Sequence, residues 1–388
     1  MFSRWLTIDP AKSCLIIGPR RSGKTTYLKT AFPSFNYVTL DDLDYLEWAK
    51  NDPKGFINSL GKQVIIDEIQ REPRLTIAVK YAIDSSDALF FMTGSSSIGL
   101  LDSAADTLAG RISLYQFPTV CWGEELGKPT HTIFTDKQTP PIIKEAQRQL
   151  QTAITYGQFP EVILQPTPPL KQTLLANYKN TYFIRDIMQL AHIEHQQGLL
   201  GIFHHIARSI GSPLETSNFA RESGLSYPTA QKYLAILTQS QLVFKLYGYQ
   251  YGPAKRYIKA AKTYFADNGI IHSLNIPLQE GQLLENFVIA ELEKRRKLGL
   301  IKSAQFYYYK SVSGREIDLI FETDDYVLYA IEIKSTKKPS RKDIRSLVAF
   351  SQVHSDRAIR LILFYTGETY DIIDTVHLIP IAALFRGI

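Results

Sequence analysis

The segment CLIIGPRRSGKTTYLK, residues 14–29, constrains the fold of this chain more than any other part of the sequence. A short apolar run leads into a loop of the form GxxxxGK followed by Thr, and a helical pattern follows the loop. Gly18 and Gly23 permit a tight turn whose backbone N–H groups can surround phosphates. Lys24 would neutralise the β- and γ-phosphates, and the Thr25 hydroxyl would bind Mg²⁺. The segment therefore predicts a site for ATP with Mg²⁺.

Every residue of this phosphate-binding loop (P-loop) is a candidate for nucleotide contact. The set is Gly18, Pro19, Arg20, Arg21, Ser22, Gly23, Lys24, Thr25 and Thr26. A chance glycine-rich loop is the alternative, but the strand, the loop, the Lys-Thr pair and the helix all occur in the required order. Arg20 and Arg21 would either add phosphate contacts or face solvent, and the sequence does not decide between the two.

A second group of polar side chains follows two later apolar runs. QVIIDEIQ ends a predicted strand in Asp67 and Glu68, and carboxyl ends of parallel strands line the ligand crevice. We expect Asp67 to hold the magnesium through water and Glu68 to polarise the attacking water. The next run, ALFFMTGSSS, would place the hydroxyls of Thr93, Ser95 and Ser96 near the γ-phosphate. These hydroxyls would sense the nucleotide or form an ordinary turn.

The length of 388 residues and the changing periodicity predict several domains with an overall α/β fold. Residues 1–126 alternate short strands with helical patterns, which indicates a parallel sheet covered by helices. Residues 127–210 combine a polar linker with helical periodicity. Residues 211–265 indicate a winged helix-turn-helix, and residues 266–388 a mixed α/β domain.

The helix-turn-helix segment leaves two interpretations open. Thr229, Gln231, Lys232 and Tyr227 would point outward from the second helix, while Ala230, Tyr233, Leu234 and Leu237 would form its apolar face. Only one outward residue is basic, which is weak for a DNA reader. Arg256 and Lys259 on the predicted wing favour DNA binding, whereas the alternative is a packing module between the flanking domains.

The stretch GREIDLIFETDDYVLYAIEIKS, which begins at Gly314, predicts a β-hairpin that carries charges among apolar residues. Because side chains alternate along strands, pairing would bring Asp318 and Glu332 together, with Lys334 beside them. Two close carboxylates repel unless a cation lies between them, and hard oxygen ligands suit Mg²⁺ or Mn²⁺. Glu285 on the preceding helix is a further candidate ligand. An ion-paired face without a metal is the alternative.

The amino-acid composition indicates the cellular compartment and the class of partner that we expect. The chain has two cysteines and no apolar run of the roughly 18 residues that a membrane span needs, so we expect a cytoplasmic protein without a membrane partner. The formal charge is +6, and basic residues gather in three clusters of the C-terminal third. The clusters are Lys255, Arg256, Lys259 and Lys262; Lys294 to Lys297; and Lys337, Lys338, Arg341 and Lys342. They favour a polyanion partner over plain solvated faces.

These motifs together resemble a bacterial and archaeal family of AAA-type ATPases whose C-terminal domain has no known function. The resemblance includes GPRRSGKT, YVTLDD, IIDEIQ, TGSS, LAGR, GQFPEVI, NYKNTYFIRDI and AKTYFADNGI, and GQFP departs where a second glycine is expected. It implies that Arg111 is an arginine finger in a homo-oligomer, or else pairs within its own domain. The hairpin with Glu285 resembles the PD-(D/E)xK nuclease superfamily, with Asp318, Glu332 and Lys334 in the catalytic positions.

Two functions follow from these expectations. The first is an ATP-binding and ATP-hydrolysing protein that acts on DNA, with a metal-dependent nuclease domain. The alternative is an ATP-gated switch that binds protein partners and carries an inactive nuclease-like docking domain. A DNA affinity that falls steeply with salt would separate the two.

Overall fold

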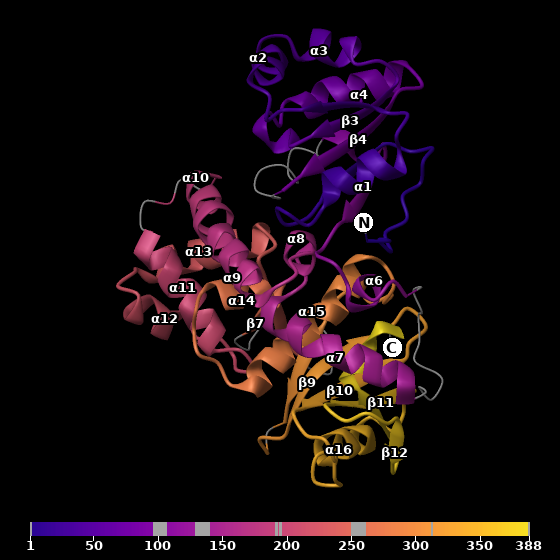
Figure 1. Ribbon diagram of the computed structural model, residues 1–388, viewed down its shortest axis with the longest axis vertical. Helices are drawn as coiled ribbons and strands as arrows, with labels where there is room; N and C mark the ends of the chain where they lie inside the picture. Colours follow the sequence, from indigo (N-terminus) through magenta and orange to yellow (C-terminus); the bar gives the residue numbers. More distant parts are fainter. Residues whose placement is uncertain are drawn as a thin grey trace.

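The computed structural model describes residues 2–95, 107–128, 140–190, 193, 196–249, 261–311 and 313–386. The N-terminal domain, at the top of Figure 1, contains a parallel sheet with the strand order β2-β3-β4-β1-β5 in the described part. Its strands are β1 (Cys14–Ile17), β2 (Asn36–Thr39), β3 (Gln63–Asp67), β4 (Leu89–Gly94) and β5 (Ser113–Gln116). The parallel sheet predicted for this part of the chain is confirmed.

Helices cover both faces of this sheet, which explains why its strands read as continuous apolar runs. Leu15 and Ile17 pack on one face of the sheet, against the helices that follow β2 in the chain. Cys14 and Ile16 pack on the opposite face, against the helix that follows the P-loop. The covering helices are α1 (Lys24–Ala31), α2 (Leu43–Asn51), α3 (Pro53–Ser59), the 3₁₀ helix η1 (Ile69–Arg71) and α4 (Leu75–Ser85). Asp42 caps α2 by accepting bonds from two backbone N–H groups of its first turn.

A helical region follows, as the 3.6-residue periodicity predicted. It comprises α6 (Trp122–Glu125), α7 (Pro140–Tyr156), α8 (Pro160–Ile163), α9 (Pro168–Tyr178), a π-helix η2 (Lys179–Asp186), α10 (Ile187–Leu190) and α11 (Gln196–Arg208). Helices α6 and α8 lie between the N-terminal sheet and the rest of the molecule (Figure 1). The eight-residue π-helix was not predicted. π-Helical turns are rare in proteins, and those that occur are often found at functional sites.

The predicted helix-turn-helix is present as α12 (Thr216–Glu222) and α13 (Tyr227–Gln239). Helix α13 buries Ala230, Tyr233, Leu234 and Leu237 and exposes Gln231 and Lys232, as the pattern indicated. The following strands, β6 (Val243–Gly248) and β7 (Lys262–Phe265), pair in antiparallel. Strand β6 also pairs with β8 (Tyr307–Lys310) of the C-terminal sheet, so this hairpin is part of that sheet rather than a separate wing. Arg256 and Lys259 lie outside the described residues.

The C-terminal region is built on a mixed sheet with the order β12-β13-β11-β10-β9-β8-β6-β7 in the described residues. Its remaining strands are β8 (Tyr307–Lys310), β9 (Glu316–Glu322), β10 (Leu328–Lys334), β11 (Ile359–Tyr365), β12 (Asp371–Ile373) and β13 (Val376–Pro380). Its helices are α14 (Asn268–Ser273), α15 (Glu280–Lys297), α16 (Arg345–Val353) and the 3₁₀ helix η3 (Ile381–Arg386). The predicted hairpin is β9–β10.

One large apolar core joins the helical region, the helix-turn-helix and one face of the C-terminal sheet. It contains Phe159 near α8, Leu237 of α13, Phe287 of α15 and Ile331 of β10. The expected boundaries near residues 210 and 265 therefore cut through shared packing. No helix in the described ranges has both the length and the apolar character that a bilayer crossing requires.

Candidate functional site

The P-loop connects the end of β1 to the start of α1, and its two glycines are required by geometry. A Cβ on Gly18 would lie 2.0 Å from the backbone oxygen of Phe117, which follows β5. Gly23 caps α1 with φ of 93°, in the left-handed region that favours glycine. The loop therefore lies against β5 while the N-terminus of α1 points into it. This is the arrangement that binds phosphates through backbone N–H groups.

The side chain of Lys24 is buried and folded back onto the loop. Its Nζ donates to the carbonyl oxygens of Gly18 at 2.8 Å and Pro19 at 3.1 Å. Burial lowers the pKa of Lys24 to about 8, although the nearby Glu68 and Asp67 carboxylates favour its charged form. A phosphate in the loop would replace these carbonyls as the partner of the ammonium group.

Asp67 accepts hydrogen bonds from hydroxyl groups on α1 and on the two neighbouring strands, β2 and β4. Its carboxylate accepts from the Thr25 hydroxyl, with 2.9 Å between Oγ1 and Oδ2, and from the Tyr37 hydroxyl at 2.9 Å. Thr93 donates to the same carboxylate. The structure thus brings together Thr25 and Asp67, the two groups expected to hold Mg²⁺. Oxygen donors beside a phosphate site fit that ion, which is commonly held by one or two carboxylates and the phosphates of the substrate.

Glu68 lies beside Asp67 with a left-handed backbone, φ 59°. Its carboxylate accepts from Ser95 Oγ at 3.2 Å and from the Gln70 amide, and the Arg20 guanidinium lies 3.9 Å away. Ser95 is therefore next to Glu68, as expected for a group near the γ-phosphate, while Ser96 lies outside the described residues. Tyr37 and Gln70 were missed because a tyrosine on a strand and a glutamine in a turn carry no functional signal.

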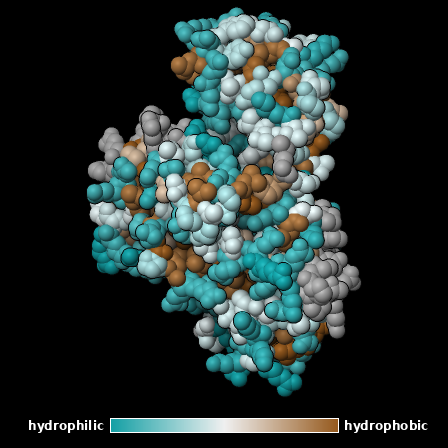
Figure 2. Space-filling view, in the orientation of Figure 1, coloured by the Kyte–Doolittle hydropathy of each residue, from teal (hydrophilic) through white to brown (hydrophobic). Residues whose placement is uncertain are grey.

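A cleft of about 430 Å³ opens at these groups. Arg20, Lys24, Thr25, Thr26, Asp67 and Glu68 line one side, and Pro160, Glu161 and Tyr182 of the helical region line the other. Hydrophilic residues border the indentation between the N-terminal domain and the helical region (Figure 2). Arg21 bridges the two sides, with Nη1 2.9 Å from Glu161 Oε1. The cleft is thus a site between two domains, which is a common place for ligands.

Arg111 is not among the residues that line this cleft, and it contacts another residue of the N-terminal domain instead. Its guanidinium binds both oxygens of Asp84 at the end of α4, with Nε–Oδ1 at 2.6 Å and Nη2–Oδ2 at 3.0 Å. Both side chains remain accessible to solvent. The structure shows the pairing within the domain, and the arginine-finger role stays a prediction.

The predicted acidic residues of the C-terminal domain do come together. Continuing the β9–β10 register from Ile331–Leu319 places Glu332 beside Asp318. Asp318 Oδ2 accepts from the backbone N–H of Ile333 at 2.8 Å, and Lys334 Nζ lies 2.8 Å from Glu332 Oε2. Glu285 accepts from the Tyr264 hydroxyl at 2.7 Å. Each of these carboxylates therefore already has a protein partner.

Burial and mutual repulsion change the acidity of this group. Burial, together with the Asp318 charge, raises the pKa of Glu285 to about 7 and that of Glu332 to about 6. Across the residues that the structure describes, no three or more His, Cys, Asp or Glu side chains are arranged to hold a metal. Glu285, Asp318 and Glu332 therefore do not form a ready site for Mg²⁺ or Mn²⁺ in this conformation.

The hairpin is also more buried than its charge pattern indicated. The expectation placed apolar residues on one face and the carboxylates on the other. Instead, both faces of β10 are buried. Ile331 packs in the large core, while Leu328 and Ala330 on the opposite face pack under α16. Glu332 is only 3% exposed because it continues this second buried face.

Among the described residues, part of the predicted polyanion surface is buried. Lys294 and Arg295 are 4% and 1% exposed, because the end of α15 is enclosed by other elements. Lys262 is also buried and pairs with Glu316. Its sequence neighbours Lys255, Arg256 and Lys259 lie outside the described residues. The third cluster, Lys337, Lys338, Arg341 and Lys342, is exposed as expected.

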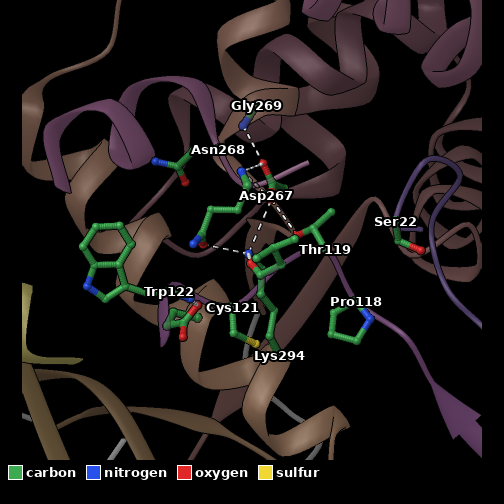
Figure 3. A network of polar contacts seen from close by, with 12 residues as sticks. Ser22, Pro118, Thr119, Cys121, Trp122, Asp267, Asn268, Gly269 and Lys294 are labelled. Atoms are coloured by element: carbon green, nitrogen blue, oxygen red, sulfur yellow. Dashed lines mark hydrogen bonds and ion pairs between the residues drawn. The ribbon is translucent and has the colours of Figure 1, made fainter. Parts of the chain in front are cut away.

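The buried Lys294 belongs to a polar network that joins three parts of the chain (Figure 3). Lys294 Nζ lies 3.4 Å from Asp267 Oδ2 and donates to Val120 O and Gln158 Oε1. Asp267 accepts from the Thr119 hydroxyl at 2.6 Å and from the Gly269 N–H at 2.8 Å, which caps α14. The segment leaving β5 is thereby fixed to α14 and α15.

Arg4 provides a second connection, directly from the P-loop. Its Nη1 donates to the backbone oxygen of Ser22 at 2.9 Å, and its Nε binds Glu124 of α6 at 2.9 Å. Trp122 of the same helix donates its backbone N–H to the Glu291 carboxylate of α15 at 3.0 Å. A continuous series of contacts therefore runs from the P-loop to the C-terminal region. A lone arginine near the N-terminus gives no sequence signal for this role.

The family model that matches the N-terminal domain is consistent with its P-loop and its parallel sheet. Residues 10–126 match a family model described as an AAA domain. Residues 147–281 and 280–384 match two models described as domains of unknown function, DUF8612 and DUF4143. The AAA match, the parallel sheet and the P-loop together support an AAA-type ATPase with an ATP site in this domain.

Similar proteins extend along most of the chain. An uncharacterised protein of Mycobacterium tuberculosis is 25% identical in an alignment of length 380 that covers 94% of this chain and 79% of the relative. An uncharacterised protein of Methanocaldococcus jannaschii is 26% identical in an alignment of length 404, gaps included, that covers 98% of this chain and 89% of the relative. The solved structure of the Aeropyrum pernix ORC1 protein in complex with DNA is 11% identical with a TM-score of 0.28, covering 72% of this chain and 88% of that one. A TM-score this low supports no inference about function.

Proposed function

We propose that this protein binds Mg²⁺·ATP in the cleft between the P-loop and the helical region and hydrolyses it. The observation that carries the proposal is the convergence of Lys24, Thr25, Asp67 and Glu68 at the ends of β1 and β3. Bound magnesium would neutralise phosphate charge during hydrolysis. Thr25 and Asp67 are the residues that would hold it.

The roles of the chain's own residues follow from their positions. The backbone of the loop and the dipole of α1 bind the phosphates, and Lys24 exchanges its carbonyl partners for phosphate oxygens. Glu68 orients the attacking water once it leaves Gln70 and Ser95, its present partners. Ser95 contacts both Glu68 and Gln70, so it is well placed to respond to the γ-phosphate.

A turnover measurement tests this proposal. The wild type should release phosphate from ATP only with Mg²⁺, and Lys24→Ala should lose both binding and turnover. Glu68→Gln should retain ATP and turn it over at least about 10²-fold more slowly, because it removes the general base without removing the phosphate contacts. Turnover at the wild-type rate in Glu68→Gln would contradict the assigned role.

We further propose that the protein acts on DNA, supported by the exposed cluster of Lys337, Lys338, Arg341 and Lys342. This cluster follows Lys334 directly, so a bound phosphate backbone would pass close to the hairpin with Glu332. Neutralising the four charges by Lys→Gln and Arg→Gln substitution should weaken DNA binding and flatten its dependence on salt. The same substitutions at Lys50, Lys54, Lys62 and Lys80 of the N-terminal domain provide a control of equal charge.

An ATP-gated switch for protein partners is the second candidate, and one observation favours it. Part of the predicted basic surface is buried, where Lys294 pairs with Asp267 and Lys262 pairs with Glu316. DNA binding that does not weaken between about 50 and 200 mM salt, or no DNA binding, would support the switch instead.

A further inference from the structure

Arg21 holds the two sides of the nucleotide cleft together through three kinds of contact. Its Nη1 lies 2.9 Å from Glu161 Oε1, next to the start of α8. Its guanidinium also donates to the Tyr182 hydroxyl, and its Cζ lies 4.7 Å from the centre of the Tyr182 ring. Tyr178 donates to the second oxygen of the same Glu161 carboxylate. We call Arg21, Glu161 and Tyr182 the latch.

Both ends of the latch have backbone conformations that cost free energy. Arg21 has φ of 63°, in the left-handed region where residues with a Cβ are uncommon. Tyr182 lies in the middle of the π-helix Lys179–Asp186, a rare conformation that is often found at functional sites. Such conformations persist where the surroundings impose them, and they concentrate at ligand-binding and switch regions. Here two of them meet at a single contact.

The contact is poorly suited to a purely stabilising role. The side chains of Arg21 and Glu161 are 40% and 48% exposed, and ion pairs with this exposure contribute little to folding stability. All three latch residues line the cleft proposed to take ATP. Arg21 is also part of the loop that would surround the phosphates. A triphosphate in that loop would therefore compete with Glu161 for the guanidinium.

We propose that the latch holds the cleft in the conformation in which Arg21 binds Glu161, and that ATP binding opens it by drawing Arg21 to the phosphates. The inference rests on the ATP binding proposed above. It identifies Glu161 and Tyr182 as the residues through which the helical region responds to the nucleotide. Because Glu161 also binds Tyr178 of α9, release of Arg21 leaves α8 and α9 joined, so they would move together.

The test is the equilibrium affinity for ATP with Mg²⁺, measured by isothermal titration calorimetry. Opening the latch consumes part of the binding free energy, so variants that weaken it should bind ATP more tightly. Glu161→Gln removes the charge and keeps an acceptor for Tyr178, and Tyr182→Phe removes the hydroxyl and keeps the ring. We expect each to tighten ATP binding by about twofold to fivefold, the range set by an exposed ion pair or hydrogen bond. Glu145→Gln, an exposed carboxylate on α7, is the matched control and should leave the affinity unchanged.

The outcomes are distinguishable. If the wild type binds ATP while Glu161→Gln and Tyr182→Phe bind it equally or more weakly, the proposed role of the latch is wrong. The proposed ATP site is not contradicted by that result. Tighter binding in Glu145→Gln as well would point to net charge and overturn the latch. If neither the wild type nor Lys24→Ala binds ATP, the proposed function fails and the latch fails with it.

Discussion

The Thr25 hydroxyl lies 2.9 Å from Asp67 Oδ2, which joins the first turn of α1 to the end of β3. This distance places side by side the two groups that are expected to hold magnesium. Tyr37 and Thr93 donate to the same carboxylate and fix its orientation. The fold therefore positions both groups that are expected to hold magnesium.

Arg111 should affect turnover and leave ATP binding unchanged. If it acts as an arginine finger in an oligomer, Arg111→Ala should retain the affinity for ATP and lose about 10³-fold or more in turnover. Asp84→Ala should keep turnover, because it removes only the present partner of Arg111. If Arg111→Ala turns over ATP at the wild-type rate, Arg111 is not an arginine finger and serves only as the ion-pair partner of Asp84 in its own domain.

The buried network around Lys294 should matter for stability. Asp267→Asn leaves the Lys294 ammonium without its carboxylate in an enclosed site, and such a loss costs about 3–5 kcal/mol. Urea unfolding, followed by tryptophan fluorescence, measures this change. The double variant Asp267→Asn with Lys294→Met should be less destabilised than the sum of the single variants. Arg341→Ala, which breaks an exposed pair with Asp374, is the control and should change little.

Glu125 should make stability depend on pH. Burial raises the pKa of its carboxyl from 4.5 to about 7, so the folded protein binds this proton more strongly than the unfolded chain. The contribution of Glu125 is therefore largest below pH 4.5 and is lost as the pH rises to about 7. Glu125→Gln should remove this loss and be more stable than the wild type at about pH 8 by about 3 kcal/mol. Equal pH profiles of unfolding for the two proteins would contradict the prediction.

The nuclease hypothesis makes a separate prediction about Lys334. It expects the wild type to cleave plasmid or single-stranded DNA with Mg²⁺ or Mn²⁺, and Lys334→Ala to lose cleavage while still binding DNA. Cleavage should also depend on ATP, and that dependence should disappear in Lys24→Ala. If the wild type leaves both DNAs intact, Lys334 and Glu332 are an ion pair in a domain without this activity.

The nucleotide site could be predicted from the sequence because its residues are local to strand ends. The P-loop is one continuous segment, and Asp67 follows an apolar run that can only be a buried strand. Parallel pairing then brings Asp67 to the P-loop without further information. Tyr37 and Gln70 could not be predicted, because their roles depend on where a side chain points after the sheet forms.

The basic segment at the end of α15 shows the opposite situation. Four consecutive basic residues are typical of a solvated surface, yet Arg295 pairs with Glu291 at full burial. The helix ends between other elements, so tertiary packing determines the environment of these charges. The π-helix that carries Tyr182 was equally unpredictable, since no residue pattern distinguishes it from a regular helix.

The most direct test of the proposed ATP site is calorimetric titration of the purified chain with ATP, in the presence and absence of Mg²⁺, beside Lys24→Ala and Thr25→Ala. We predict saturable binding by the wild type, none by Lys24→Ala, and binding by Thr25→Ala that no longer responds to Mg²⁺. Binding that is unchanged in Lys24→Ala, or absent in the folded wild type, would contradict the proposed site.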